Sequence, residues 1–471
     1  MKIKTASMIN LITILLAACV NIDPVQGAMN PTRIQVQVVE PTTEKVSPAA
    51  AQPAAPTAVQ AVSSEKPAQD AWLIALLQED NTLLRGLSAT GQPLRELGAA
   101  SGREHFAGSS DPAHPWFSLY SPDDDSLNII NVLAESPAEL LVTLKSKELP
   151  EEKRALLKTE FLRTDQPAQV WSPDGTRLAY LDVPSGDKTR LMLFDTATKT
   201  STVLSQATED VVAPVWSPDG MWVLYQTIDG FTAQGLPQVT SMHAVRSNGS
   251  EDNLLYEPTS LRETVLGWAG PEIFAVQTMM ERGNLDLRLV SIKDASSLKM
   301  DVGLVKNASW DAKMQSAFYL LTSSETNNEQ PSGVYTISAT APQAMVLPGK
   351  WEQLQYFTSS GVLAASMPGE VGMIHPNGTI TSIKGVDSPI TISPDGQFYV
   401  LNNTNGSVSI YGKEGASIGQ LSEKPLQEAF FTPDSQKIYF TVSSQLFIAS
   451  APDWKPQPST DATSLLGWVG F

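Results

Sequence analysis

Short stretches of alternating apolar and polar residues recur along the chain, and several are built around the same tight turn. The sequence reads VWSPDGTRLAY from Val170 to Tyr180 and VWSPDGMWVLY from Val215 to Tyr225. Proline presets the backbone for the second position of a type I turn, serine and aspartate can bond the local backbone, and glycine accepts a positive φ. The alternating flanks are typical of strands. Each copy therefore predicts a β-hairpin.

The hairpin is repeated, which indicates a repeat architecture rather than an isolated motif. Further copies read TISPDGQFYVL from Thr391 to Leu401 and FFTPDSQKIYF from Phe430 to Phe440. A second hairpin, usually built on Asn-Gly or Gly, follows these turns, as in VGMIHPNGTITSI from Val371 to Ile383. Each unit is thus four antiparallel strands over roughly 35 to 50 residues, the size of a propeller blade. With degenerate copies included, the first turn recurs near residues 173, 218, 270, 311, 358, 394 and 433.

The two ends of the globular part are expected to meet. Ala71 to Leu97 predicts three strands of a blade without its inner strand, and Ser464 to Phe471 resembles the inner strand at 265–269. The last strand would then complete the first blade and close the ring. Pro115 to Leu144 is a further candidate blade. Pro150 to Leu162 predicts a short helical insertion near 150–163, because proline and two glutamates stand at its start.

A literal count of these units is nine, but known propellers commonly have four to eight blades. We therefore predict a single all-β propeller of four-stranded blades over residues 70–471, with eight blades, and with seven as the alternative. Aromatic residues stand at the ends of the predicted inner strands, and we expect them to fill the wedges between blades rather than to bind a ligand. They are Trp171, Trp216, Trp268 and Trp310.

The N-terminus has the pattern of an export signal. Lys2 and Lys4 precede an apolar stretch from Met8 to Ala18, which is too short to span a membrane. The stretch ends in Leu-Ala-Ala-Cys at Cys19, the only cysteine in the sequence. This pattern resembles the bacterial lipobox, which implies a signal peptide over 1–18 and a lipid on the thiol of Cys19. Cleavage by an ordinary signal peptidase after Gly27 is the alternative.

The segment that follows Cys19 is expected to be a tether. Residues 20 to about 69 are rich in Pro, Ala, Thr, Gln and Val and contain no aromatic residue. Such a segment cannot bury enough apolar area to offset the entropy of ordering it. We predict that residues 19–69 hold the propeller outside the cytoplasm on a lipid anchor. Both the outer and the cytoplasmic membrane fit this pattern.

The chain is acidic, with 32 Lys and Arg against 50 Asp and Glu and a formal net charge of −18. Nucleic acid binding needs a basic surface, so no nucleic acid partner is expected. The four histidines form no local metal motif, and the sequence has no zinc pattern, phosphate-binding glycine loop or cofactor fingerprint. We therefore predict neither a metal nor a cofactor.

The WSPDG hairpin with its alternating second strand resembles the repeat of TolB-like propellers, which are related to the WD-repeat-like bacterial propellers. The resemblance covers residues 168–458 well and implies a propeller fold. TolB itself has a separate N-terminal domain where this chain has the tether, so its partners are not carried over. The same hairpin occurs in prolyl-oligopeptidase-like enzymes. Their α/β-hydrolase domain is not expected here, because the sequence ends just after its last predicted blade.

Two short motifs could carry chemistry, and both have a structural explanation. Gly415 to Gly419 fits G-x-S-x-G around Ser417, but a nucleophile elbow needs a strand-to-helix turn and a later histidine, and none follows His375. The acidic run Asp123-Asp124-Asp125 could offer oxygen ligands to calcium, but it lacks the EF-hand spacing and fits a solvated turn better. We assign no catalytic residue.

The links between the second and third strands of the units differ in length, which makes their face the candidate interaction surface. We predict a non-catalytic scaffold that binds an envelope protein or a cell-wall component there. The alternative is an envelope hydrolase or lyase with its site at the mouth of the central channel. The long links are Leu181–Arg190, Thr227–Gln238 and Thr322–Gly333.

Overall fold

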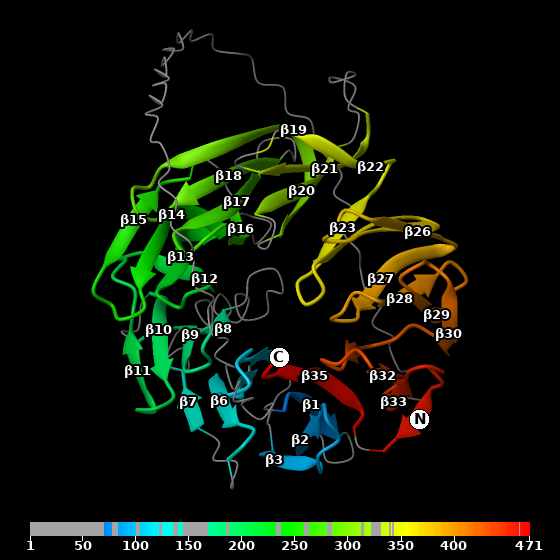
Figure 1. The fold of residues 1–471 in the computed structure, drawn as a ribbon. Helices are drawn as coiled ribbons and strands as arrows, with labels where there is room; N and C mark the ends of the chain where they lie inside the picture. Colours follow the sequence, from blue (N-terminus) through cyan, green and yellow to red (C-terminus); the bar gives the residue numbers. More distant parts are fainter. Residues whose placement is uncertain are drawn as a thin grey trace, which may run out of the picture. The chain divides into compact units, whose positions relative to one another are not determined.

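The computed structural model describes residues 70–77, 83–99, 104–121, 125–134, 140–144, 168–184, 188–231, 237–258, 263–279, 285–311, 315–321, 331–338, 341, 343–460 and 462–471. These residues form a ring of antiparallel sheets (Figure 1). The predicted signal peptide, Cys19, the tether and the predicted helix at 150–163 lie outside the described residues. None of the described residues belongs to a helix that is long and apolar enough to cross a membrane.

The first four blades each contain four strands. Blade 1 consists of β1 (Trp72–Leu77), β2 (Leu83–Ser88), β3 (Arg95–Ala99) and β35 (Ser464–Val469). Blade 2 consists of β4 (Glu104–Gly108), β5 (Trp116–Ser121), β6 (Ser126–Asn131) and β7 (Leu140–Thr143). Blade 3 consists of β8 (Gln169–Trp171), β9 (Arg177–Asp182), β10 (Arg190–Asp195) and β11 (Thr200–Val203). Blade 4 consists of β12 (Asp210–Trp216), β13 (Trp222–Phe231), β14 (Pro237–Arg246) and β15 (Asp252–Tyr256).

Blades 5 and 6 share one seven-stranded sheet, because β19 serves both. The start of β19 pairs with β18 as the outer strand of blade 5, and its end pairs with β20 as the inner strand of blade 6. The strands are β16 (Glu263–Trp268), β17 (Ile273–Met279), β18 (Leu285–Ser291), β19 (Ser297–Asp311), β20 (Ser316–Leu321), β21 (Gly333–Ser338) and β22 (Ala344–Pro348).

The last three blades are again four-stranded. Blade 7 consists of β23 (Gln353–Phe357), β24 (Val362–Met367), β25 (Glu370–Ile374) and β26 (Ile380–Lys384). Blade 8 consists of β27 (Val386–Ile392), β28 (Phe398–Asn403), β29 (Val408–Gly412) and β30 (Ser417–Ser422). Blade 9 consists of β31 (Ala429–Phe431), β32 (Lys437–Val442), β33 (Gln445–Ser450) and β34 (Gln457–Ser459).

The ring has nine blades, so the prediction of eight, with seven as the alternative, is wrong. The all-β propeller with four-stranded blades is confirmed. The literal count of nine hairpin units matches the number of blades in the ring. The prediction was reduced to eight because known propellers commonly have four to eight blades. The number of blades follows from how many blade-forming units the chain contains. Side chains between neighbouring sheets then fill the wedges that this number creates.

The C-terminal strand closes the ring as predicted. β35 pairs antiparallel with β1, with Trp468 opposite Leu73, and takes the inner position of blade 1. The likeness between LGW in β35 and LGW in β16 has a steric cause. A Cβ at Gly467 would lie 2.6 Å from Phe106 Cε1 in blade 2, and a Cβ at Gly267 would lie 2.8 Å from Trp310 Cδ1 in blade 6. Glycine at both positions makes room for the aromatic ring of the next blade.

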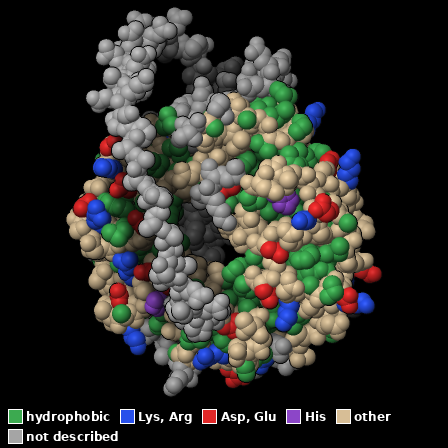
Figure 2. Space-filling view, in the orientation of Figure 1, with side chains coloured by type: hydrophobic (Ala, Val, Ile, Leu, Met, Phe, Trp, Pro, Cys, Tyr) green, Lys and Arg blue, Asp and Glu red, His purple; other side chains and the backbone are tan. Residues whose placement is uncertain are grey.

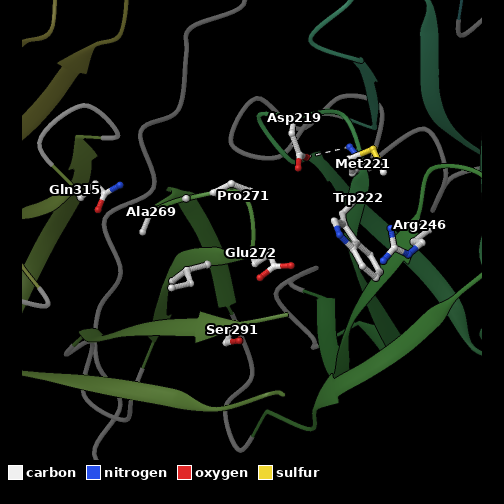
Figure 3. A pocket seen from close by; sticks show the side chains of 11 residues that line it. Asp219, Met221, Trp222, Arg246, Ala269, Pro271, Glu272, Ser291 and Gln315 are labelled. Atoms are coloured by element: carbon white, nitrogen blue, oxygen red, sulfur yellow. Dashed lines mark hydrogen bonds between the residues drawn. The ribbon is translucent and has the colours of Figure 1, made fainter. Parts of the chain in front are cut away.

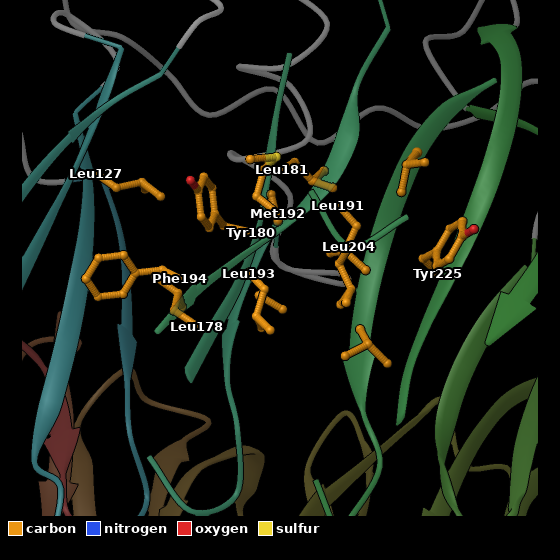
Figure 4. Packing of buried hydrophobic residues seen from close by; sticks show 14 of the residues in the cluster. Leu127, Leu178, Tyr180, Leu181, Leu191, Met192, Leu193, Phe194, Leu204 and Tyr225 are labelled. Atoms are coloured by element: carbon orange, nitrogen blue, oxygen red, sulfur yellow. The ribbon is translucent and has the colours of Figure 1, made fainter. Parts of the chain in front are cut away.

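The hydrophobic core lies between blades rather than within one sheet. Figure 4 shows this for blade 3, where Tyr180 and Phe194 pack beside Leu127 of blade 2, and Leu204 lies toward Tyr225 of blade 4. Three of the predicted tryptophans also connect neighbouring blades through their indole N–H groups. The acceptors are the backbone oxygens of Ala107 for Trp171, of Val170 for Trp216 and of Trp268 for Trp310, each at 3.0 Å.

Candidate functional site

The repeated Ser-Pro-Asp-Gly turn is held by its own side chains. Ser172 Oγ donates to Asp174 Oδ1 at 2.5 Å and accepts the backbone N–H of Arg177 at 3.0 Å. Gly175 takes the predicted positive φ of 64°. Burial alone would raise the pKa of Asp174, but hydrogen bonds from Ser172 and Thr176 lower it below its ordinary value. The same bonds recur in the turns that begin at Ser217, Ser393 and Thr432.

The seam between blades 3 and 4 is closed on the face that carries these turns. Arg177 of blade 3 reaches across and donates to the backbone oxygens of Gly220 at 3.2 Å and Ser247 at 3.4 Å. Its guanidinium also lies 5.3 Å from the centre of the Trp216 ring. The Trp216 indole N–H in turn bonds Val170 of blade 3. Arg177 of blade 3 and Trp216 of blade 4 thus each donate a hydrogen bond to the backbone of the other blade.

The next seam, between blades 4 and 5, departs from this pattern. Trp222 occupies the position in the blade 4 hairpin that Arg177 has in blade 3, so no guanidinium reaches from there toward blade 5. Gly270-Pro271-Glu272 replaces the Ser-Pro-Asp-Gly turn of blade 5. The buried indole N–H of Trp268 has no hydrogen-bond partner among the described residues, unlike those of its counterparts in blades 3, 4 and 6.

A hollow of about 660 Å³ opens over this seam on the turn face (Figure 3). Its floor includes buried Trp222, whereas Met221 is 48% exposed and Ile273 is 41% exposed at its walls. Two large apolar side chains are therefore presented to solvent inside a concave site. The hollow is lined by Asp219, Met221, Trp222, Arg246, Ala269, Gly270, Pro271, Glu272, Ile273, Ser291 and Gln315.

Two polar side chains of the hollow are held by neighbouring groups, and a third is available to bind a partner. The Arg246 guanidinium lies 4.5 Å from the centre of the Trp222 ring and pairs with Glu251 at 3.0 Å, so its position is defined. Asp219 is occupied by its own turn, where it accepts the amide of Met221 at 3.0 Å. Within the part of the chain that the structure describes, no side chain pairs with the exposed Glu272 carboxylate, which projects from the facing turn in Figure 3. The hollow thus combines apolar walls, one oriented cation and one available anion.

The residues singled out from the sequence do not assemble into a second site. Ser417 is exposed at the first position of β30, an outer strand, and no helix follows it, so the G-x-S-x-G match is not a nucleophile elbow. Asp125 is buried and accepts the Tyr120 hydroxyl at 3.1 Å, while Asp123 and Asp124 lie outside the described residues. Where the chain is described, no group of three His, Cys, Asp or Glu side chains is placed to hold a metal.

The hollow was not predicted from the sequence, because the links that differ most in length lie on the opposite face. All three long links contain residues outside the described part, so a site on that face stays a prediction. The signal for the hollow is nevertheless present in the sequence. It is the loss of the repeat at two neighbouring turns, where Trp222 and Glu272 replace the expected residues. The space-filling view in Figure 2 shows acidic and basic side chains interspersed on the visible face.

No protein-family model matches this chain, and no curated protein sequence matches it. Solved structures match it by fold. A structure described as the eukaryotic initiation factor has a TM-score of 0.55 and 14% sequence identity, and the match covers 85% of this chain and 98% of that one. Dipeptidyl peptidase 4 from Porphyromonas gingivalis has a TM-score of 0.50 and 12% identity, over 75% of this chain and 59% of that one.

TolB from Acinetobacter baumannii is also similar to this chain, with a TM-score of 0.31 and 12% identity over 74% of this chain and 62% of that one. That score is too low to carry an argument about relationship. At these identities the comparisons show a propeller fold, which unrelated functions share. A peptidase is among the similar structures, but at 12% identity the likeness shows the fold alone, and the function has to be argued from the site.

Proposed function

We propose that this protein is an exported, lipid-anchored β-propeller that binds a protein partner of the bacterial envelope in the hollow between blades 4 and 5. The observation that carries the proposal is the hollow itself, in which Met221 and Ile273 stay exposed beside the ordered Arg246. Its volume of about 660 Å³ falls within the range of roughly 300 to 1,000 Å³ that is usual for ligand sites.

The chemistry of the hollow favours a peptide segment over a small metabolite. Exposed apolar side chains suit an aliphatic or aromatic side chain of the partner, and the free Glu272 carboxylate suits a Lys or Arg. The net charge of −18 also favours association with a basic segment, since opposite charges steer the encounter. The partner is therefore an envelope protein that presents an apolar residue next to a basic one.

The anchor rests on the sequence alone. Cys19 follows an apolar stretch in the Leu-Ala-Ala-Cys pattern, and residues 19–69 have the composition of a tether. Lipid on Cys19 would hold the propeller at a membrane while the tether lets it reach partners. Replacing Cys19 with Ser should move the protein from the detergent phase to the aqueous phase in cell fractionation. If the variant stays in the detergent phase at unchanged mass, the anchor is wrong.

Photo-crosslinking in living cells tests the binding site. A photoreactive phenylalanine analogue at Met221 or Ile273 should give an adduct of one defined mass. The matched control is Met345, which is 44% exposed on the outer strand β22 of blade 6. The exchange Glu272→Lys should reduce the adduct at least about fivefold, the effect of losing about 1 kcal/mol of binding free energy. Equal adducts at Met345, or no effect of Glu272→Lys, would overturn the proposed site.

A further inference from the structure

A serine, a histidine and an aspartate meet in blade 4, on the side that faces blade 3. Ser241 and His243 stand two residues apart on β14, so their side chains project from the same face of the sheet. Ser241 Oγ lies 2.8 Å from Nε2 of His243. Asp252, at the start of β15, places Oδ1 3.5 Å from Nδ1 of the same ring. Each imidazole nitrogen thus faces the partner that it has in a nucleophile–base–acid arrangement.

The carboxylate of Asp252 is ionised and fixed. Its side chain is 3% exposed, and it accepts the Tyr225 hydroxyl at 2.7 Å and the backbone N–H of Gln206 at 2.6 Å. Burial alone would raise the pKa of Asp252, but the neighbouring His243 and the hydrogen bonds from Tyr225 and Gln206 lower it below its ordinary value. An anion beside Nδ1 favours the tautomer with its proton on Nδ1, which leaves Nε2 free to accept from Ser241.

The orientation of the imidazole and of the serine is also defined. The Tyr225 ring stacks on His243 with centroids 4.9 Å apart and planes inclined by 15°. Thr227 Oγ1 contacts Ser241 Oγ on its other side and bonds Thr240 Oγ1 at 2.8 Å. When Ser241 donates to His243, the Thr227 hydroxyl can donate to Ser241. Such a hydrogen bond stabilises negative charge that develops on the serine oxygen.

We propose that Ser241, His243 and Asp252 form a site that hydrolyses small acyl esters, separate from the hollow between blades 4 and 5. Ser241 Oγ attacks the ester carbonyl carbon while its proton passes to Nε2 of His243. The ester C–O bond breaks, and the alcohol leaves with that proton. Water then attacks the acyl-serine through His243, which releases the carboxylic acid and restores the serine. Asp252 and Tyr225 are positioning residues.

The exposure of the site sets the size of its substrate. Ser241 is 8% exposed and the His243 side chain is 15% exposed, so the approach from solvent is narrow. We therefore expect a short acyl ester to reach Ser241 more readily than a peptide does. Nδ1 of His243 lies 3.5 Å from Oδ1 of Asp252 and makes no hydrogen bond of good geometry, so the proposed reaction requires these two groups to move closer together.

The test uses the full-length protein with 4-nitrophenyl acetate as substrate and a fluorophosphonate as serine probe. We expect ester hydrolysis and probe attachment at Ser241, both abolished in Ser241→Ala and reduced at least about tenfold in His243→Gln. The matched control is Ser417→Ala, which removes an exposed serine without a histidine neighbour and should change neither signal. Activity that survives Ser241→Ala, or a probe attached elsewhere, would overturn the proposal.

A second variant keeps the test independent of folding. In Ser241→Cys, the new thiol should react with iodoacetamide faster than the same thiol in the double variant Ser241→Cys/His243→Gln, because a base beside a thiol favours the reactive thiolate. Equal rates in the single and the double variant would show that His243 does not act as a base, and would overturn the proposal.

Discussion

Two neighbouring seams of the ring use the same tryptophan position in opposite ways. Between blades 3 and 4, Trp216 bonds Val170 and Arg177 closes the turn face above it. Between blades 4 and 5, Trp268 is equally buried but its indole N–H has no partner within the described part of the chain, and a hollow takes the place of the arginine bridge. The comparison shows that a repeat scaffold gains a concave site when two adjacent turns lose the repeated residues.

The difference is local, because the same seams are alike further out. Trp222, Met242 and Leu255 of blade 4 pack against Phe274 and other side chains of blade 5 in a buried cluster. Buried apolar side chains therefore fill the wedge at both seams, and the difference described above lies at the turn face. A site built in this way does not require the blades to separate.

The largest effect is expected from opening the ring that holds both seams. Deletion of Ser464–Phe471 removes β35, exposes the edge of β1 and strips Trp468 and Val469 from the core. Each large apolar side chain that loses its burial costs about 1.5 to 3 kcal/mol, against a total stability of about 5 to 15 kcal/mol for a typical domain. The truncated protein should be largely unfolded and rapidly digested by protease. Deletion of residues 327–330, which keeps the acceptor oxygens of Pro331 and Ser332, is the control and should leave protease resistance unchanged.

The second expected effect distinguishes the closed seam from the open one. Arg177→Ala leaves the oxygens of Gly220 and Ser247 without their donor and removes the cation over Trp216, which should cost about 1 to 3 kcal/mol. The matched variant Arg246→Ala also removes a cation over a tryptophan ring, at Trp222, but it breaks only an ion pair with the half-exposed Glu251 and leaves no described backbone oxygen without its donor, so it should cost about 1 kcal/mol. Urea unfolding of both variants gives the two values. Equal costs would mean that the arginine bridge does not distinguish the seams.

The third pair of variants tests the indole N–H groups alone. Trp216→Phe loses a hydrogen bond and leaves the oxygen of Val170 unpaired, which should cost about 1 to 2 kcal/mol beyond the change in ring size. Trp268→Phe removes a donor that has no partner among the described residues, so only the change in ring size remains. The difference between the two unfolding free energies measures the effect. A larger cost at Trp268 would contradict the comparison.

The smallest effect is expected from acid. Since the folded pKa of Asp252 is lowered, its ionised form stabilises the seam between blades 3 and 4 at neutral pH. This contribution is complete above the unfolded pKa, near 3.9 for an ordinary Asp, and is lost as the pH falls through the lower folded value. The wild-type protein should therefore lose stability more steeply than Asp252→Asn below about pH 4. Urea midpoints that fall in parallel for the two proteins would exclude this role.

Much of the fold was predictable because its information is local. The Ser-Pro-Asp-Gly turns, their positive-φ glycine and the alternating strands follow from adjacent residues, and even the count of nine units is present in the sequence. The pairing of β35 with β1 was predicted from a short likeness, LGW, that packing against the next blade explains. The departure from the repeat at Trp222 was likewise visible, although its consequence was not.

Only the tertiary structure decided which side chains meet across the sheets and seams. Ser241 and His243 share a strand, but Asp252 joins them after a hairpin, and Tyr225 and Gln206 come from other elements. Arg177 finds its acceptors 43 and 70 residues further along the chain. The sequence by itself determined the repeated hairpin, because turn and strand preferences act between neighbouring residues. The bridge, the hollow and the Ser–His–Asp cluster depend on the twist and spacing of whole blades, which no short segment specifies.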